Sequence, residues 1–149
     1  MLFSTINFIY SVTYQTVMKE EKHLNAFEEH RAVIDWAIDR GVEKSQRIIA
    51  THASRGAIEL LSYYLHKFNK IDAGFQINHR WFKSPQVGSR LPEFEKKELL
   101  VPKFVKVETL CENLTYGSQK AVNEVKELVE LFNEVERLLN ELIRGADKK

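Results

Sequence analysis

The stretch VNEVKELVELFNEVERLLNELI, residues 122–143, decides the fold. Its apolar residues recur at alternating intervals of three and four, which places them along one side of an α-helix as a heptad seam. The seam consists of Val125, Leu128, Phe132, Val135, Leu139 and Leu142. Leu131 and Leu138 widen this apolar side, so the sequence predicts a helix at the centre of a bundle, with apolar surface left for a second copy of the chain.

Three further helices are predicted before this one. The first covers residues 19–40 and ends at a glycine, the second covers about 43–69, and the third about 92–116. Pro102 lies inside the third helix, where it lacks the backbone N–H and is expected to kink the helix or split it in two. The predicted fold is therefore all-α, an antiparallel up-and-down four-helix bundle with room for one extra short helix.

Between the second and third helices lies a long connection, residues 70–92. Two glycines and two prolines interrupt it, so only one or two helical turns are expected, around residues 76–83. Large aromatic side chains are more often buried than exposed. Trp81 and Phe82 are therefore predicted to cap the end of the bundle. The alternative is that they stack on nucleic-acid bases while Arg80, Lys83 and Arg90 neutralise phosphates.

Length and composition limit the class of protein. The chain has 149 residues, of which 29% are charged, with only six glycines and three prolines, as expected of one domain built from long helices. Its single cysteine excludes an internal disulfide and favours a reducing, cytoplasmic setting. Residues 1–17 fit neither a signal peptide nor a membrane-spanning helix. We expect them to be an extension outside the domain proper, residues 18–149, and Met18 to be a candidate start.

Charge is distributed unevenly along the chain. Acidic residues outnumber basic ones in residues 18–43 and again in residues 118–144, whereas basic residues prevail from His79 to Lys106. The basic residues of this middle segment are Arg80, Lys83, Arg90, Lys96, Lys97, Lys103 and Lys106. If the protein binds an anion, this segment is the favoured place. An ordinary solvated lysine-rich surface is the alternative.

A polar stripe follows one side of the second helix, next to its apolar side. It contains His52, Arg55, Glu59, Tyr63 and His66, which fall within one narrow arc at about 100° of rotation per residue. Imidazoles beside a guanidinium and a carboxylate can bind an anion or transfer protons. The alternative is a stripe that faces solvent or a symmetry-related copy and binds nothing.

We predict that a ligand site forms where this stripe meets the connection around Arg80. Its residues are His52, Arg55, Glu59, His66 and Arg80. Arg55 and Glu59 are four residues apart on one helix and are expected to pair with each other, which would leave the imidazoles free for an anionic ligand. Binding should then strengthen below about pH 6.5 and weaken with salt.

Other kinds of site have little support in the sequence. Di-metal sites in helical bundles need a Glu-x-x-His spacing on each of two helices, and only Glu20 to His23 provides one. No phosphate-cradling glycine loop, nucleophile elbow or paired-cysteine motif occurs. We therefore expect no metal and no cofactor, and a binding protein rather than an enzyme.

The second helix resembles a known family. IATHASRGAIELLSYYLHK, residues 49–67, is similar to the second helix of HEPN domains (higher eukaryotes and prokaryotes nucleotide-binding), with Ala57 and Glu59 at matching places. The order of elements also agrees: a basic aromatic loop around His79, a third helix ending near LCENLTYG at residues 110–117, and a long acidic heptad helix. The similarity spans about residues 24–143.

The resemblance implies a four- to five-helix bundle that dimerises, pairs with a minimal nucleotidyltransferase, or acts as a metal-independent ribonuclease. Nuclease members carry an Arg-x4-6-His motif late in the domain, and residues 107–118 contain neither Arg nor His. The chain therefore resembles a non-nuclease member that binds a partner protein or a nucleotide- or RNA-type ligand. Two alternatives stay open: a ribonuclease that uses Arg47 and His52, which satisfy the spacing on the second helix, and a purely structural homodimeric module.

Overall fold

In a computed structural model the chain is all-helical. Residue 1 is not described, and side chains are described for residues 19–149. The four α-helices are α1 (Leu2–Arg40), α2 (Gln46–Lys67), α3 (Lys97–Thr115) and α4 (Val122–Asp147). Three short 3-10 helices complete the fold: η1 (Val42–Lys44), η2 (His79–Lys83) and η3 (Pro85–Arg90). The extension expected over residues 1–17 lies outside the residues whose side chains are described.

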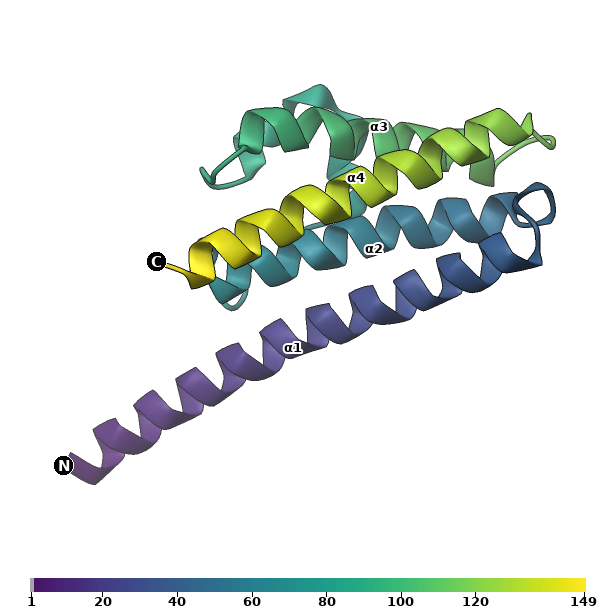
Figure 1. The fold of residues 1–149 in the computed structure, drawn as a ribbon. Coiled ribbons are helices and arrows are strands. Elements are labelled where there is room, and N and C mark those ends of the chain that lie inside the picture. Colours follow the sequence, from purple (N-terminus) through teal and green to yellow (C-terminus); the bar gives the residue numbers. More distant parts are fainter. Residues whose placement is uncertain (1) are drawn as a thin grey trace.

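Successive α-helices run in opposite directions and lie side by side (Figure 1). The helix α2 is the central element, because it packs against α1, α3 and α4. The all-helical class predicted from the sequence is thus confirmed. No helix in the described part of the chain is both long enough and apolar enough to cross a membrane.

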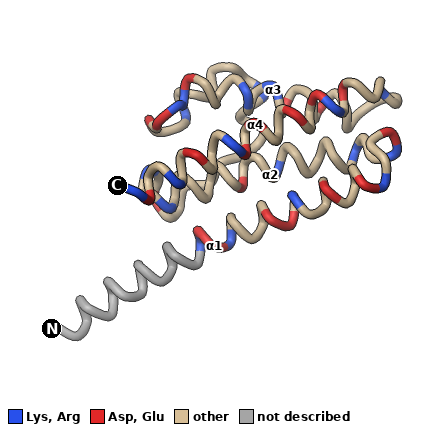
Figure 2. Tube along the Cα trace, in the orientation of Figure 1, with Lys and Arg blue, Asp and Glu red and all other residues tan. Residues whose placement is uncertain are grey.

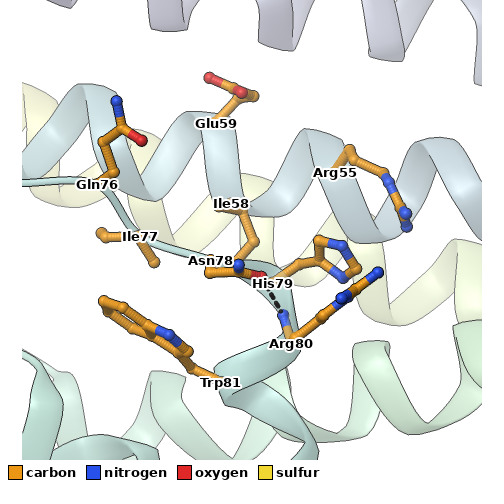
Figure 3. Close-up of a pocket in the computed structure, with 9 residues that line it drawn as sticks. All are labelled: Arg55, Ile58, Glu59, Gln76, Ile77, Asn78, His79, Arg80 and Trp81. Carbon is orange, nitrogen blue, oxygen red and sulfur yellow. Dashed lines mark hydrogen bonds between the residues drawn. The ribbon is translucent and has the colours of Figure 1, made fainter.

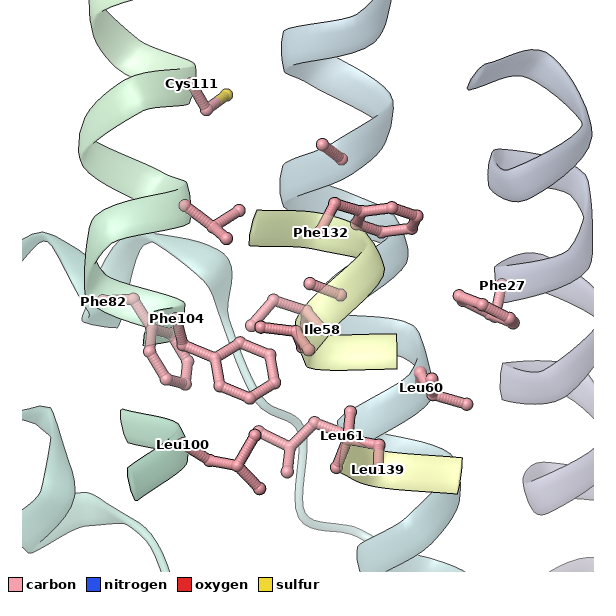
Figure 4. Close-up of a cluster of buried hydrophobic side chains, with 14 of the residues drawn as sticks. Phe27, Ile58, Leu60, Leu61, Phe82, Leu100, Phe104, Cys111, Phe132 and Leu139 are labelled. Carbon is pink, nitrogen blue, oxygen red and sulfur yellow. The ribbon is translucent and has the colours of Figure 1, made fainter. Parts of the chain in front are cut away.

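The heptad seam of α4 is buried as predicted. All six of its residues, from Val125 to Leu142, are at most 4% exposed. Phe132 extends from α4 toward Phe27 of α1, and their ring centroids are 6.3 Å apart (Figure 4). On another side of the core, the ring centroids of Phe82 in η2 and Phe104 in α3 are 5.4 Å apart. The other elements of the same chain therefore cover the seam, and no second copy is needed to do so.

The turn between α1 and α2 depends on one glycine. Gly41 ends α1 with φ of 127°, a backbone conformation that residues with a side chain rarely adopt. Its N–H donates to the carbonyl groups of Ala37 and Ile38, which ends the helix. The chain reverses here, and η1 leads into α2.

Gly56 permits close packing where three helices meet. It lies in the middle of α2, and a Cβ atom there would be 3.1 Å from Cβ of His30 on α1 and 3.3 Å from the ring of Phe132 on α4. Both neighbours belong to other helices. The absence of a side chain on Gly56 therefore lets α1 and α4 approach α2 closely.

The connection between α2 and α3 contains the two 3-10 helices η2 and η3. Phe82 is fully buried and Trp81 is packed partly against the core, so the predicted burial is confirmed for Phe82 and in part for Trp81. Phe82 packs on Phe104, midway along α3, and not at an end of the bundle. Asn78 caps η2 by accepting a hydrogen bond from the N–H of Arg80. The hydrogen bond between Nδ1 of His79 and Glu108 then attaches the loop that carries Arg80 to α3.

The third helix differs from its predicted form in two ways. It begins at Lys97 rather than near residue 92, because Phe94 turns into the core at 8% exposure and Lys96 adopts a left-handed conformation with φ of 61°. It also continues through Pro102 without a break, so the predicted splitting is wrong. The proline is exposed and removes a single donor one turn into the helix.

Ion pairs explain part of the uneven charge. Lysines of the basic middle segment reach acidic residues of α4, as in Lys103–Glu134 at 2.9 Å and Lys106–Glu127 at 2.7 Å. Figure 2 shows the charged residues along α3 and α4. These pairs neutralise much of the basic segment, so the positive charge left for a ligand is concentrated elsewhere, around η2.

Candidate functional site

The polar stripe of α2 exists, but its histidines face α1. Nδ1 of His52 lies 2.8 Å from Nδ1 of His30. His66 stacks on His23, with ring centroids 5.3 Å apart and the rings 8° from parallel. The prediction that these imidazoles are free for a ligand is therefore wrong. They lie in the interface between α1 and α2.

Arg55 and Glu59 do not pair with each other. Oε2 of Glu59 lies 2.6 Å from Nδ1 of His23 on α1. Within residues 19–149, the guanidinium of Arg55 makes one weak hydrogen bond, 3.5 Å to Oγ of Ser54. The expected pair is replaced because the carboxylate of Glu59 contacts His23 of α1, and this leaves Arg55 without an ion pair among these residues.

A groove lies between α2 and the segment that leads into η2. It has a volume of about 490 Å³. Figure 3 shows its lining: Arg55, Ile58, Glu59, Gln76, Ile77, Asn78, His79, Arg80 and Trp81. A smaller hollow of about 200 Å³ adjoins it on the side of α3 and shares Arg55, His79 and Arg80 with it. The structure therefore brings together three of the five residues predicted for the site: Arg55, Glu59 and Arg80.

A buried carboxylate holds the central imidazole of the groove. Glu108 of α3 is 5% exposed, and Oε1 lies 2.9 Å from Nδ1 of His79. Its other oxygen, Oε2, accepts a hydrogen bond of 2.6 Å from Oγ of Ser54. A carboxylate acceptor fixes the proton of His79 on Nδ1, which leaves Nε2 with its lone pair. An imidazole oriented in this way can accept a proton or a hydrogen bond from a ligand in the groove.

Two arginines share the hollows with this imidazole. Arg55 and Arg80 line both the groove and the smaller hollow together with His79 (Figure 3). Among the ion pairs of residues 19–149, none involves Arg55 or Arg80. Unneutralised arginines that share a concave surface attract anions, and their planar groups suit phosphate in particular.

Trp81 forms the far wall of the groove. The guanidinium of Arg90 lies over its ring, 5.2 Å from the centroid, and the ring of Phe75 meets it edge-on at 6.0 Å. These contacts hold the indole in place. An aromatic ring beside unpaired arginines provides a surface on which a nucleobase can stack.

The Arg47–His52 pair of the ribonuclease alternative is not assembled. Arg47 donates hydrogen bonds to the carbonyl oxygens of Thr115 and Gly117, at 3.2 Å and 2.7 Å, where α3 ends. His52 contacts α1 instead, through His30. The two side chains therefore serve different interfaces of the fold.

Nor does Cys111, which lines the smaller hollow, provide a nucleophile. Burial raises the pKa of its thiol above the ordinary value. A buried thiol in its protonated form is a poor nucleophile. Across residues 19–149, no group of three or more His, Cys, Asp or Glu side chains is placed so that it could hold a metal ion.

Sequence reasoning missed the pair His79–Glu108. One signal was present: Glu108 lies between Phe104 and Cys111 at helical spacing, on the apolar side of its helix. A charged residue at such a position must find a buried partner. The identity of that partner depends on how the connection folds back, and the sequence does not show this.

No protein-family model matches the chain, and no curated protein and no solved structure is significantly similar to it.

Proposed function

We propose that this chain is a bundle of the HEPN kind that binds a nucleotide- or RNA-type ligand in the groove between α2 and η2. The observation that carries the proposal is that Arg55 and Arg80, which make no ion pair within residues 19–149, line the same two hollows as His79, whose imidazole is held by a buried carboxylate. The arginines attract a phosphate, and Nε2 of His79 accepts a hydrogen bond from a sugar hydroxyl.

The position of Trp81 supports a ligand that carries a base as well as a phosphate. The indole lines the same groove as Arg55 and Arg80, and Arg90 supports its ring. A phosphate at the arginines therefore leaves an attached nucleoside within the groove, beside the ring. Inorganic phosphate alone would not use this wall, so a nucleotide is expected to bind more tightly than phosphate.

Fluorescence anisotropy with labelled RNA oligomers and nucleotides at low salt tests the proposal. We expect Arg80→Ala and Arg55→Ala each to weaken binding by about tenfold, the value of one charge-assisted contact. Arg144→Ala is the matched control, because Arg144 is exposed on α4 and lines neither hollow. If the control weakens binding as much as the groove variants, binding is a property of the overall charge, and the site is not in the groove.

The ribonuclease alternative can be tested with the same purified protein and RNA. A metal-independent ribonuclease would transfer the 2′-hydroxyl proton of RNA to an imidazole while the new O2′–P bond replaces the P–O5′ bond. His79, and not His52, lines the groove together with Arg55 and Arg80, so such cleavage should disappear in His79→Ala. Intact RNA after incubation in chelator excludes this reading. Binding to a partner protein such as a minimal nucleotidyltransferase, and a purely structural homodimer, remain predictions that no contact among the described residues favours.

A further inference from the structure

Four of the five histidines of the chain lie in one row between α1 and α2. The row consists of His23 and His30 from α1 and of His52 and His66 from α2. His79, the fifth, lies in the groove and belongs to a different interface. Such a concentration of imidazoles at a single helix interface makes that interface sensitive to pH between about 5 and 7.

We propose that this row is a pH-sensitive latch, which holds α1 against α2 while the imidazoles are neutral and releases α1 when they become charged. The inference concerns the stability of one helix and does not depend on the ligand proposed for the groove.

The pair His30–His52 tolerates at most one added proton. With Nδ1 atoms only 2.8 Å apart, one ring must donate and the other must accept. When both rings are cationic, two N–H donors and two positive charges face each other, which is repulsive. The charged groups around the pair are Glu29 of α1 and Glu59 and Arg55 of α2. The carboxylates attenuate the repulsion, whereas Arg55 adds to it.

The pair His23–His66 has an even less favourable place for charge. His66 is 2% exposed, and within residues 19–149 its Nε2 has no hydrogen-bond partner. The backbone of Phe75 raises the pKa of His66, but burial, the larger cause, lowers it. Lys19 and His23 are the basic groups that face His66 from α1. A proton on His66 therefore creates a buried cation beside other cations, which is costly. His23, which stacks on His66, has its Nδ1 2.6 Å from Oε2 of Glu59, so this carboxylate is the acidic group that contacts the pair from α2.

The directions of the pKa changes agree with this geometry. Burial lowers the pKa of His30, with His52 as the next cause. Burial likewise lowers the pKa of His52, where Arg55 adds to the effect, and that of His66, where His23 does. A histidine with a lowered pKa stabilises the closed state fully above its ordinary pKa of about 6.5, and this stability is lost as the pH falls below that value.

The arrangement of helices directs the effect to α1. Its backbone approaches only α2 and η1, whereas α2, α3 and α4 all pack against one another. Contacts of α1 with α4 are made by long side chains, such as Arg31 with Glu136 at 3.0 Å and Phe27 with Phe132. Repulsion between the charged histidines therefore separates α1 from α2. The helices α2, α3 and α4 stay in contact with one another.

Hydrogen exchange measured by mass spectrometry tests the latch. After correction for the intrinsic pH dependence of exchange, we expect amides of residues 19–40 to open more often at pH 5.5 than at pH 7. Between pH 7 and pH 5.5, the fraction of molecules with α1 released should rise by about eightfold for each histidine that binds a proton in the released state but not in the closed state. Amides of α4 should change much less. Equal opening of α1 and α4, or exchange of α1 that does not depend on pH, would overturn the proposal.

Variants separate the latch from general acid destabilisation. In His52→Gln/His66→Phe, one member of each pair no longer titrates, and the pH dependence of α1 exchange should fall by at least tenfold. In the control His79→Gln, a histidine outside the row is removed and the dependence should remain. If the double variant does not fold, NMR titration of the unmodified protein decides. Imidazoles of His30, His52 and His66 that titrate at or above pH 6.5 would contradict the latch.

Discussion

Glu108 is the residue whose removal should have the largest local effect. It is buried and accepts hydrogen bonds from Ser54 and His79, so Glu108→Ala leaves two donors without an acceptor and opens space beside them. We expect the free energy of unfolding to fall by about 2–4 kcal/mol. Urea denaturation followed by circular dichroism measures this change.

Glu112, one helical turn further along α3, is the matched control for that measurement. Its carboxylate pairs with Lys83 at 3.1 Å, but both side chains are about half exposed. Such a surface pair contributes about 0–1 kcal/mol, so Glu112→Ala should hardly change the stability. If the two variants were equally stable, the network around Glu108 would not stabilise the fold.

Individual residues of the candidate site could be predicted only in part. Arg55 and Arg80 are identifiable from the sequence because Arg55 belongs to the polar stripe and Arg80 to the basic connection, although Arg55 was expected to pair with Glu59. The partners of His52, Glu59 and His66 are not, because all of them lie on α1, and helical periodicity does not reveal which neighbouring helix a polar stripe faces. Contacts between distant segments decide this, and they are absent from local patterns.

At the scale of elements, α3 offers a direct test of local propensity against packing. Pro102 lies within this helix and is exposed, so its ring contributes nothing to the core. Replacing it with alanine restores a backbone donor and removes a clash with the preceding turn. We expect Pro102→Ala to raise the free energy of unfolding by about 1–3 kcal/mol. Alanine also makes the unfolded chain more flexible than proline does, which reduces this gain slightly.

Thermal and urea unfolding of Pro102→Ala decide the sign. A gain in stability shows that the helix continues through the proline despite its cost, because Val101 and Phe104 are anchored in the core on either side. A loss would show the opposite, namely that the packing of α3 against α2 requires a bend at this position.

Helices with strong periodicity could be located well from the sequence, and those with weak signals could not. The seam of α4 has no interruption, and its predicted residues are all buried. The beginning of α3 was placed about five residues too early, because Pro92 resembles a helix start. What delays the helix is the packing of Phe94 against Tyr64 of α2, at 6.0 Å between ring centroids, which is a tertiary contact.

For the whole molecule, the distribution of charge follows from how the helices pair. Acidic α4 lies beside the lysines of α3, so those charges neutralise each other within the fold. The groove at η2 is lined by two arginines, Arg55 and Arg80, that make no ion pair within residues 19–149. The middle segment was therefore correctly identified as basic, but only a part of it is available for an anion, and no count of charges along the chain could show which part.

The size of the particle in solution is the last prediction at this scale. The sequence predicts a homodimer because the apolar seam and flanks of the last helix exceed what three short neighbouring helices can cover. Within the described residues that side is buried, and the large apolar side chains that remain exposed lie on different elements: Trp36, Leu99, Tyr116 and Val122. Scattered single residues of this kind do not form the continuous patch that a stable dimer buries. The homodimer therefore stays a prediction, which light scattering at micromolar concentration tests. Twice the mass of one chain, 17.4 kDa, would support it, and the mass of one chain would contradict it. If a dimer forms, Trp36→Ala, which removes the exposed aromatic of α1, tests whether α1 carries the interface.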